Sequence, residues 1–151
     1  MQTLVEYLRN HVPLTREIDI RAGSQTDHWL ELTAPLHPNL NDKQTAFGGS
    51  LATLCTLSGW CVCSMLCREL KQEIDIAVID SQIRYHQPVT GDPITARACF
   101  PAIENQQRFI ETLRKEGRAR LNLKAKVNVG DTTAVSFEAS YYARLPDKHL
   151  G

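Results

Sequence analysis

The spacing of apolar and polar residues along the chain changes period several times, and each period predicts a different element. Residues 2–11 carry apolar side chains at helical spacing and predict a short amphipathic helix, which Pro13 ends. Two segments with strand-like alternation follow, at residues 16–23 and 28–35. The chain therefore begins with a short helix and then two short strands.

The next segment has no charged side chain over residues 46–66 and predicts one long helix, from Gly48 to about Leu70. At 1.5 Å per residue this helix would be roughly 34 Å long. Glycine, serine and threonine are too frequent in it for a membrane-spanning helix, which is normally rich in large apolar residues. Small side chains recur along one face, where a curved sheet can pack closely: Ala52, Cys55, Thr56, Gly59 and Cys63. The pattern favours a buried central helix.

The second half of the chain reads mainly as strands. Alternation predicts strands at residues 76–89, 94–103, 119–129 and 133–145, and a helix at 105–116 that Gly117 ends. The last two strands, joined at Gly130 and Asp131, predict a hairpin. This order indicates an α+β fold with one antiparallel sheet packed on a single central helix, and residues 1–151 are predicted to form one domain.

Composition and cysteine content exclude some classes of protein and indicate a cellular compartment. Lys and Arg together number 17, as do Asp and Glu, and this zero net charge argues against a nucleic-acid-binding protein. The first apolar stretch is broken by charges, so we expect no signal peptide. Five cysteines, an odd number, suit a reducing compartment, and we expect a cytoplasmic protein. Cys61 and Cys63 point to different sides of the long helix, so we expect no metal site.

The start of the long helix carries the best candidate chemistry. "TAFGGSL" places Gly48 and Gly49 where the first backbone N–H groups of a helix have no partner. These groups and the helix dipole can hold a carbonyl oxygen as it becomes negative during acyl transfer. Close packing of the entering loop would also explain the two glycines. The residues alone leave both explanations open.

A longer motif surrounds these glycines. "APLHPNLNDKQTAFGGSLATLCTLSGW" at residues 34–60 resembles the signature of the thioesterase family that also forms the C-terminal domain of YiiD-type proteins. The resemblance continues through "IDSQIRYHQPVTGD" and into the last hairpin. It implies the hotdog fold, in which a curved antiparallel sheet wraps around one long helix. Related acyl-CoA thioesterases often carry His-Gly-Gly at the helix start, and here Phe47 replaces the histidine.

The resemblance also implies an activity and a set of site residues. It implies hydrolysis of acyl-coenzyme A or acyl-carrier-protein thioesters by direct attack of water, without a cofactor, in a homodimer or tetramer. Gly48 and Gly49 would form the oxyanion site, and Asn41 would hold the water or the carbonyl. Phe47 and Thr56 are expected to contact substrate. The charged turn "LRKEGRAR" supplies Arg114 and Arg118, which can pair with the phosphates of coenzyme A, although a solvated turn would explain these charges too.

The proton acceptor is the open point, because Thr56 stands where many relatives carry an aspartate on the helix. Asp80 is the leading candidate and Asp42 the second, and a water aligned by Asn41 and backbone donors needs no carboxylate. Two other functions stay open. A binding module for acyl thioesters would need no acceptor. A dehydratase or hydratase would need a histidine where Phe47 stands.

Overall fold

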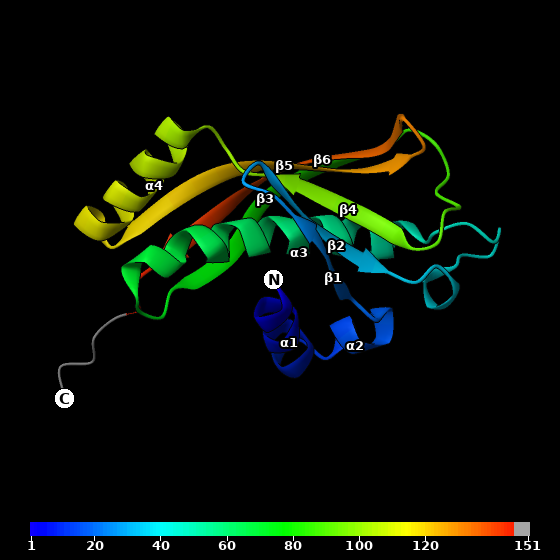
Figure 1. Ribbon diagram of the computed structural model, residues 1–151, viewed down its shortest axis with the longest axis horizontal. Coiled ribbons are helices and arrows are strands. Elements are labelled where there is room, and N and C mark those ends of the chain that lie inside the picture. Colours follow the sequence, from blue (N-terminus) through cyan, green and yellow to red (C-terminus); the bar gives the residue numbers. More distant parts are fainter. Residues whose placement is uncertain (147–151) are drawn as a thin grey trace.

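One six-stranded sheet curves around one long helix in the computed structural model, which describes residues 1–146 (Figure 1). In chain order the elements are α1 (Gln2–His11), α2 (Leu14–Ile18), β1 (Arg21–Gln25), β2 (Trp29–Ala34), the 3-10 helix η1 (His37–Asn39), α3 (Gly48–Cys67), the 3-10 helix η2 (Arg68–Leu70), β3 (Asp75–Tyr85), β4 (Ile94–Cys99), α4 (Ile103–Glu116), β5 (Arg118–Val129) and β6 (Thr132–Arg144). The predicted α+β plan is confirmed.

The strands follow the order β1-β2-β4-β5-β6-β3, and each neighbouring pair is antiparallel. Along β5 the apolar residues alternate strictly with polar ones, so one side of the strand is buried and the other is exposed. The buried side faces α3 together with the inward residues of β6. The hairpin predicted from this alternation is confirmed, and Gly130 with φ of 60° forms its turn.

Helix α3 lies inside the curve of the sheet and supplies much of the core. Its buried residues include Leu51, Leu54 and Val62. The helical span Gly48–Leu70 is long and apolar enough to cross a membrane, because an 18-residue stretch of it has a mean hydropathy of 1.6. However, 56% of that stretch is buried inside the protein. The small-residue face has a clear partner: Gly59 lies against the ring of Tyr141 on β6. The position and burial of α3 are those of a core helix.

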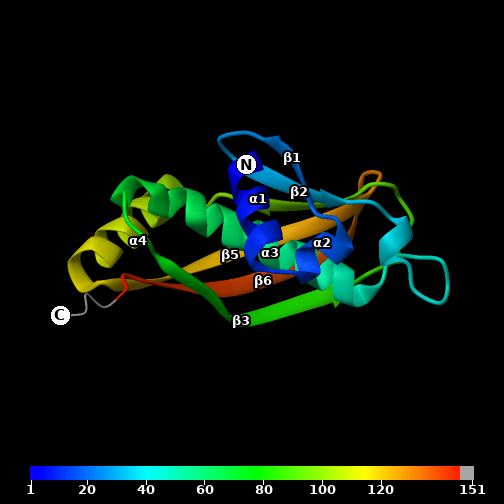
Figure 2. The same ribbon diagram turned by 90° about the horizontal axis from the view of Figure 1, so that it is seen from below.

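Helices α1 and α2 lie on the opposite side of α3 from the sheet, as Figure 2 shows from below. The Tyr7 ring of α1 stacks on Trp60 of α3 with the ring centroids 5.8 Å apart. The prediction of a strand over residues 16–23 was wrong in its first half. Pro13 has helical backbone angles and starts α2, and Asp19 ends it with a positive φ of 62°, so the strand begins only at Arg21.

Strand β3 forms one edge of the sheet, and its outer side has no partner strand among residues 1–146. Most of its side chains are exposed, including Val78 and Ile79, where a bulge interrupts the pairing with β6. Its last residue, Tyr85, pairs with the fully buried Val135. The free edge ends beside the start of α3.

Candidate functional site

The start of α3 presents three backbone donors that no group in residues 1–146 accepts. The N–H groups of Gly48, Gly49 and Ser50 have no hydrogen-bond partner there, and no side chain caps the helix. Leu51 is the first residue whose N–H is used, by the carbonyl of Phe47 at 3.1 Å. Because α3 is 20 residues long, these donors lie at the positive end of a full helix dipole. The arrangement can hold an oxyanion.

Asn41 lies in the loop that leads into this turn, and its side chain mostly holds that loop. Its Oδ1 accepts hydrogen bonds from the backbone N–H groups of Lys43 at 2.8 Å and Thr45 at 3.1 Å. Its Nδ2 donates to the Thr45 hydroxyl at 2.8 Å. One Nδ2 hydrogen has no acceptor in the described part of the chain. Asn41 therefore shapes the loop and keeps one donor for a water or a carbonyl.

Asn39 holds the loop before α3 in place, and the sequence analysis did not predict this role. Its side chain is 2% exposed, and its Nδ2 donates to the carbonyls of Ile18 at 3.0 Å and Pro35 at 2.8 Å. The carbonyl of Asn39 accepts the Phe47 N–H at 2.7 Å. Asn39 thereby fixes the residue that precedes α3. The only signal in the sequence is its place two residues before Asn41 in the motif.

Two aromatic rings cover the bare faces of the two glycines. A Cβ added to Gly49 would meet the ring of Phe47, with Cζ 3.0 Å away. A Cβ on Gly48 would lie 3.6 Å from the ring of Tyr85, an ordinary contact. The rings are partly open to solvent, with Phe47 55% and Tyr85 52% exposed. A methyl group at Gly49 would therefore displace the exposed Phe47 ring, whereas Gly48 leaves room for a methyl group.

Hydroxyl groups also reach the carbonyls of this first turn. The Tyr85 hydroxyl donates to the Gly48 carbonyl at 3.2 Å, and the Thr53 hydroxyl donates to the Gly49 carbonyl at 2.8 Å. Neither residue was a predicted site residue. Thr53 could have been found from its position four residues after Gly49. Tyr85 could not, because 37 residues separate it from Gly48.

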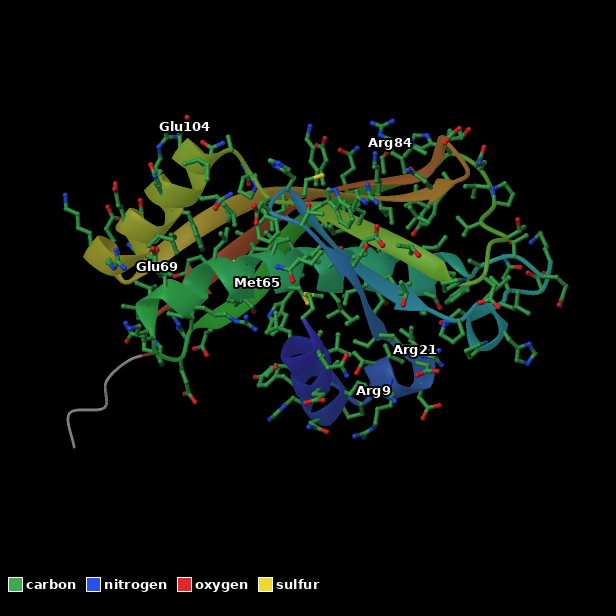
Figure 3. The ribbon with its side chains drawn as sticks, in the orientation of Figure 1. Arg9, Arg21, Met65, Glu69, Arg84 and Glu104 are labelled. Atoms are coloured by element: carbon green, nitrogen blue, oxygen red, sulfur yellow. The ribbon has the colours of Figure 1, made fainter. Side chains whose placement is uncertain are left out.

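Asp80 does not meet the glycines within one chain. It pairs with Ser140, whose hydroxyl bonds to Asn122 on the polar face of β5. Residues paired across strands share a face, so Asp80 projects from the side of the sheet opposite α3. Arg84, four residues further along β3, projects from that side in Figure 3. Asp42, the second candidate, is exposed in the entry loop and lies 3.4 Å from the ammonium group of Lys43.

The predicted substrate-binding residues are spread along the molecule. Phe47 borders the glycines, but Thr56 lies two turns further along α3, where its carbonyl accepts the Tyr141 hydroxyl at 2.6 Å. Arg114 and Arg118 lie where α4 joins β5. Helix α4 sits beside the far end of α3, near Met65 and Glu69 (Figure 3). That end is roughly 30 Å from the glycines along a helix of 20 residues.

The cysteines of α3 behave as core residues. Burial raises the pKa of Cys55 and Cys61 to about 12, and the hydrogen bond with the Cys67 thiol together with burial raises that of Cys63. These thiols stay protonated at neutral pH and are poor nucleophiles. Residues 1–146 contain no group of three His, Cys, Asp or Glu side chains that could hold a metal ion.

Comparisons with known proteins find a matching family and similar structures. The family model described as "Putative thioesterase (yiiD_Cterm)" matches residues 1–145. A protein of unknown function from Chlorobaculum tepidum TLS has a similar structure, with 28% identity, a TM-score of 0.88 and coverage of 95% of this chain and 93% of that chain. A putative thioesterase from Shewanella oneidensis has 27% identity and a TM-score of 0.79, covering 95% and 96%.

A thioesterase from Haemophilus influenzae shares the fold alone, with 16% identity, a TM-score of 0.65 and coverage of 98% of this chain and 92% of that chain. The sheet around a central helix is the hotdog arrangement that the motif at residues 34–60 implied, and the fold prediction is confirmed. The match over residues 1–145 shows that the chain belongs to the putative thioesterase family of the YiiD C-terminal-domain type.

Proposed function

We propose that the protein hydrolyses acyl thioesters of coenzyme A or acyl carrier protein by direct attack of water. One observation carries the proposal: the N–H groups of Gly48, Gly49 and Ser50 have no acceptor within residues 1–146. Free donors at the start of a long helix suit an oxygen that becomes negative. The family and the similar structure from Shewanella oneidensis favour a thioester as the substrate.

In the proposed reaction the thioester carbonyl oxygen accepts the Gly49 N–H. A water oxygen attacks the carbonyl carbon, and the negative charge that develops on the carbonyl oxygen is held by the backbone donors and the helix dipole. The carbon–sulfur bond then breaks, and the proton from the water ends on the leaving thiol. No covalent enzyme intermediate is needed.

Two routes for the proton of the attacking water differ in whether they use Asp80. Asp80 faces away from α3 in its own chain, so its predicted role would need a second copy of the chain to bring it to the glycines. The position of Asp80 gives more support to a water aligned by the free Nδ2 hydrogen of Asn41 and the backbone donors. The Asp80→Asn variant separates these two mechanisms.

We infer that the protein acts as a homodimer, with the free edge of β3 as the contact between copies. An unpaired edge strand of 11 residues with exposed apolar side chains is typical of a surface that pairs with another strand. Ile79→Lys should then give a monomer by light scattering, whereas Ile103→Lys, at an isoleucine that is 60% exposed on α4, should not. A dimer in both variants would reject this contact. We also infer a cytoplasmic setting, in which the five free thiols stay reduced.

A non-catalytic acyl-thioester binding module is the second candidate, and one feature favours it. Helix α3 carries no carboxylate between Gly48 and Cys67. Such a module would bind an acyl thioester through the same backbone donors and release no thiol.

The test is thiol release from acetyl-, hexanoyl- and palmitoyl-coenzyme A by the wild type, Asn41→Ala, Asp80→Asn and the control Asp131→Asn, which lies in the β5–β6 turn. The proposal expects release by the wild type and by Asp131→Asn and a marked loss in Asn41→Ala. Full activity in Asp80→Asn would exclude Asp80 as the base. Binding without thiol release from any of the three would identify the binding module instead.

A further inference from the structure

Both glycine carbonyls in the first turn of α3 accept a side-chain hydroxyl, and the two hydroxyls differ in origin. Thr53 belongs to α3 itself and reaches back four residues to the Gly49 carbonyl at 2.8 Å. Tyr85 is the last residue of β3 and donates to the Gly48 carbonyl at 3.2 Å. Of these two hydrogen bonds, the Tyr85 bond joins the first turn of the helix to the sheet, whereas the Thr53 bond lies within the helix.

The carbonyl of Gly48 and the N–H of Gly49 are parts of the same peptide group. That group is planar, so a bond that fixes the carbonyl oxygen also fixes the direction of the N–H on its other side. A hydrogen bond accepted at the oxygen also polarises the N–H and makes it a stronger donor. The Tyr85 hydroxyl therefore acts on the N–H that the proposed reaction uses.

Tyr85 is well placed to hold this peptide still. Its backbone pairs with Val135, which is fully buried. Its ring lies at van der Waals distance from the bare face of Gly48, 3.6 Å from the position of a Cβ there. The two glycines have no side chains of their own to restrict rotation of the peptide between them. The helical bond from the Ala52 N–H to the Gly48 carbonyl holds one side of the peptide, and the Tyr85 hydroxyl adds a restraint from outside the helix.

We propose that Tyr85 is a positioning residue for the oxyanion site, which it serves by orienting and polarising the Gly48–Gly49 peptide through its hydroxyl. This inference rests on the proposed thioester hydrolysis. Tyr85 itself touches neither the water nor the acyl group in this role. Its effect appears in the transition state, when the carbonyl oxygen gains charge, more than in the binding of the substrate.

Tyr85→Phe removes only the hydroxyl and keeps the ring. On whichever of acetyl-, hexanoyl- and palmitoyl-coenzyme A the wild type hydrolyses fastest, kcat should fall about three- to tenfold, as expected for one lost hydrogen bond. KM should change less than about twofold, because the bond matters in the transition state. Tyr142→Phe, at a β6 tyrosine whose hydroxyl has no partner within residues 1–146, is the matched control and should keep the wild-type kcat and KM.

Thr53→Val tests which peptide N–H holds the oxyanion. It removes the hydrogen bond from the Thr53 hydroxyl to the Gly49 carbonyl, which belongs to the Gly49–Ser50 peptide. Its kcat should fall less than that of Tyr85→Phe. A larger fall in Thr53→Val would assign the oxyanion to the Ser50 N–H and overturn the proposal. Unchanged kcat in Tyr85→Phe, or a fall matched by an equal rise in KM, would overturn it as well.

Amide hydrogen exchange keeps this test separate from that of the proposed function. The Leu51 N–H bonds to Phe47, and the Ala52 N–H is the helical partner of the Gly48 carbonyl. Both should exchange faster in Tyr85→Phe than in the wild type, whether or not any thioester is hydrolysed. If the wild type releases no thiol and exchange is unchanged in Tyr85→Phe, both proposals fail. If exchange rises without hydrolysis, the proposed function fails, and with it the catalytic purpose of the contact, while the hold of Tyr85 on the Gly48–Gly49 peptide stands.

Discussion

Gly59 packs against Tyr141, so changing it to alanine has two opposite effects: it overpacks the core, and it favours the helix. A Cβ at position 59 would lie 2.6 Å from Cζ of Tyr141 and closer still to its hydroxyl oxygen. Tyr141 is fully buried, and its hydroxyl donates to the Thr56 carbonyl at 2.6 Å. The ring therefore cannot move away without disturbing the core or losing this bond.

The size of the effect follows from three contributions. Overpacking a core typically costs about 1–3 kcal/mol, and weakening the buried hydrogen bond adds about 1 kcal/mol. Alanine in place of glycine inside a helix returns about 1 kcal/mol. Gly59→Ala should therefore lower the free energy of unfolding by about 2 kcal/mol, which corresponds to a fall in Tm of about 4–8 °C for a chain of this length.

Urea titration and thermal melting of Gly59→Ala measure this directly, with Gly91→Ala as the control because nothing lies within 4 Å of a Cβ there. Gly91→Ala should leave Tm close to that of the wild type. In the double variant Gly59→Ala with Tyr141→Phe, the loss should be smaller than the sum of the single losses, because the hydroxyl that the methyl group would meet is gone. A Gly59→Ala variant as stable as the wild type would refute the assigned contact.

Three further predictions concern the loop, the thiols and the acid end of the stability curve. Asn41→Asp keeps an acceptor for the backbone N–H of Thr45 but lacks the amide donor, so kcat should fall while Tm, measured by melting, drops by no more than about 2 °C. At pH 8 a thiol reagent should modify the exposed Cys99 quickly and the four buried cysteines of α3 only after unfolding, as counted by mass spectrometry. The hydrogen bond from Arg21 lowers the pKa of Asp19 below its usual 3.8. The ionised carboxylate of Asp19 therefore stabilises the fold at pH values above 3.8, and this stabilisation is lost as the pH falls through the lowered pKa. Asp19→Asn should lose about 1 kcal/mol or less at pH 7 and depend less on pH below about 4, as shown by urea midpoints at pH 7 and pH 3.

Local patterns in the sequence were enough for most of the fold. Uncharged residues with small side chains at helical spacing predicted α3 from its first residue, and strict alternation with Gly130 predicted the β5–β6 hairpin. Helix α2 was missed because its five residues are too few to show a period. Its start depends on Pro13 and its end on the positive φ of Asp19, and neither gives a helical pattern.

The site was predictable only as far as it is local. Phe47, Gly48 and Gly49 are consecutive, and Asn41 lies in the loop before them, so one motif contains all four. Along β3, Asp80 alternates onto the polar side of the strand with Gln82 and Arg84, and such a side normally faces solvent. The choice of Asp80 as the leading base candidate went against this pattern, and its pairing with Ser140 places it on the side of the sheet opposite α3. The Tyr85 contact also depends on topology, since β3 returns to the start of α3 only through its pairing with β6.

Close packing and the proposed chemistry are compatible at the two glycines. The Phe47 ring lies over the bare face of Gly49, so a side chain there would have to displace this ring, which is 55% exposed. Packing does not explain Gly48, where a methyl group would make an ordinary contact 3.6 Å from Tyr85. Nor does packing explain why no side chain caps a helix of 20 residues and why three N–H groups at its start have no acceptor within residues 1–146. Unpaired backbone donors at a helix start are usually satisfied by a cap, by water or by a ligand, and the proposed hydrolysis assigns these three donors to the acyl oxygen.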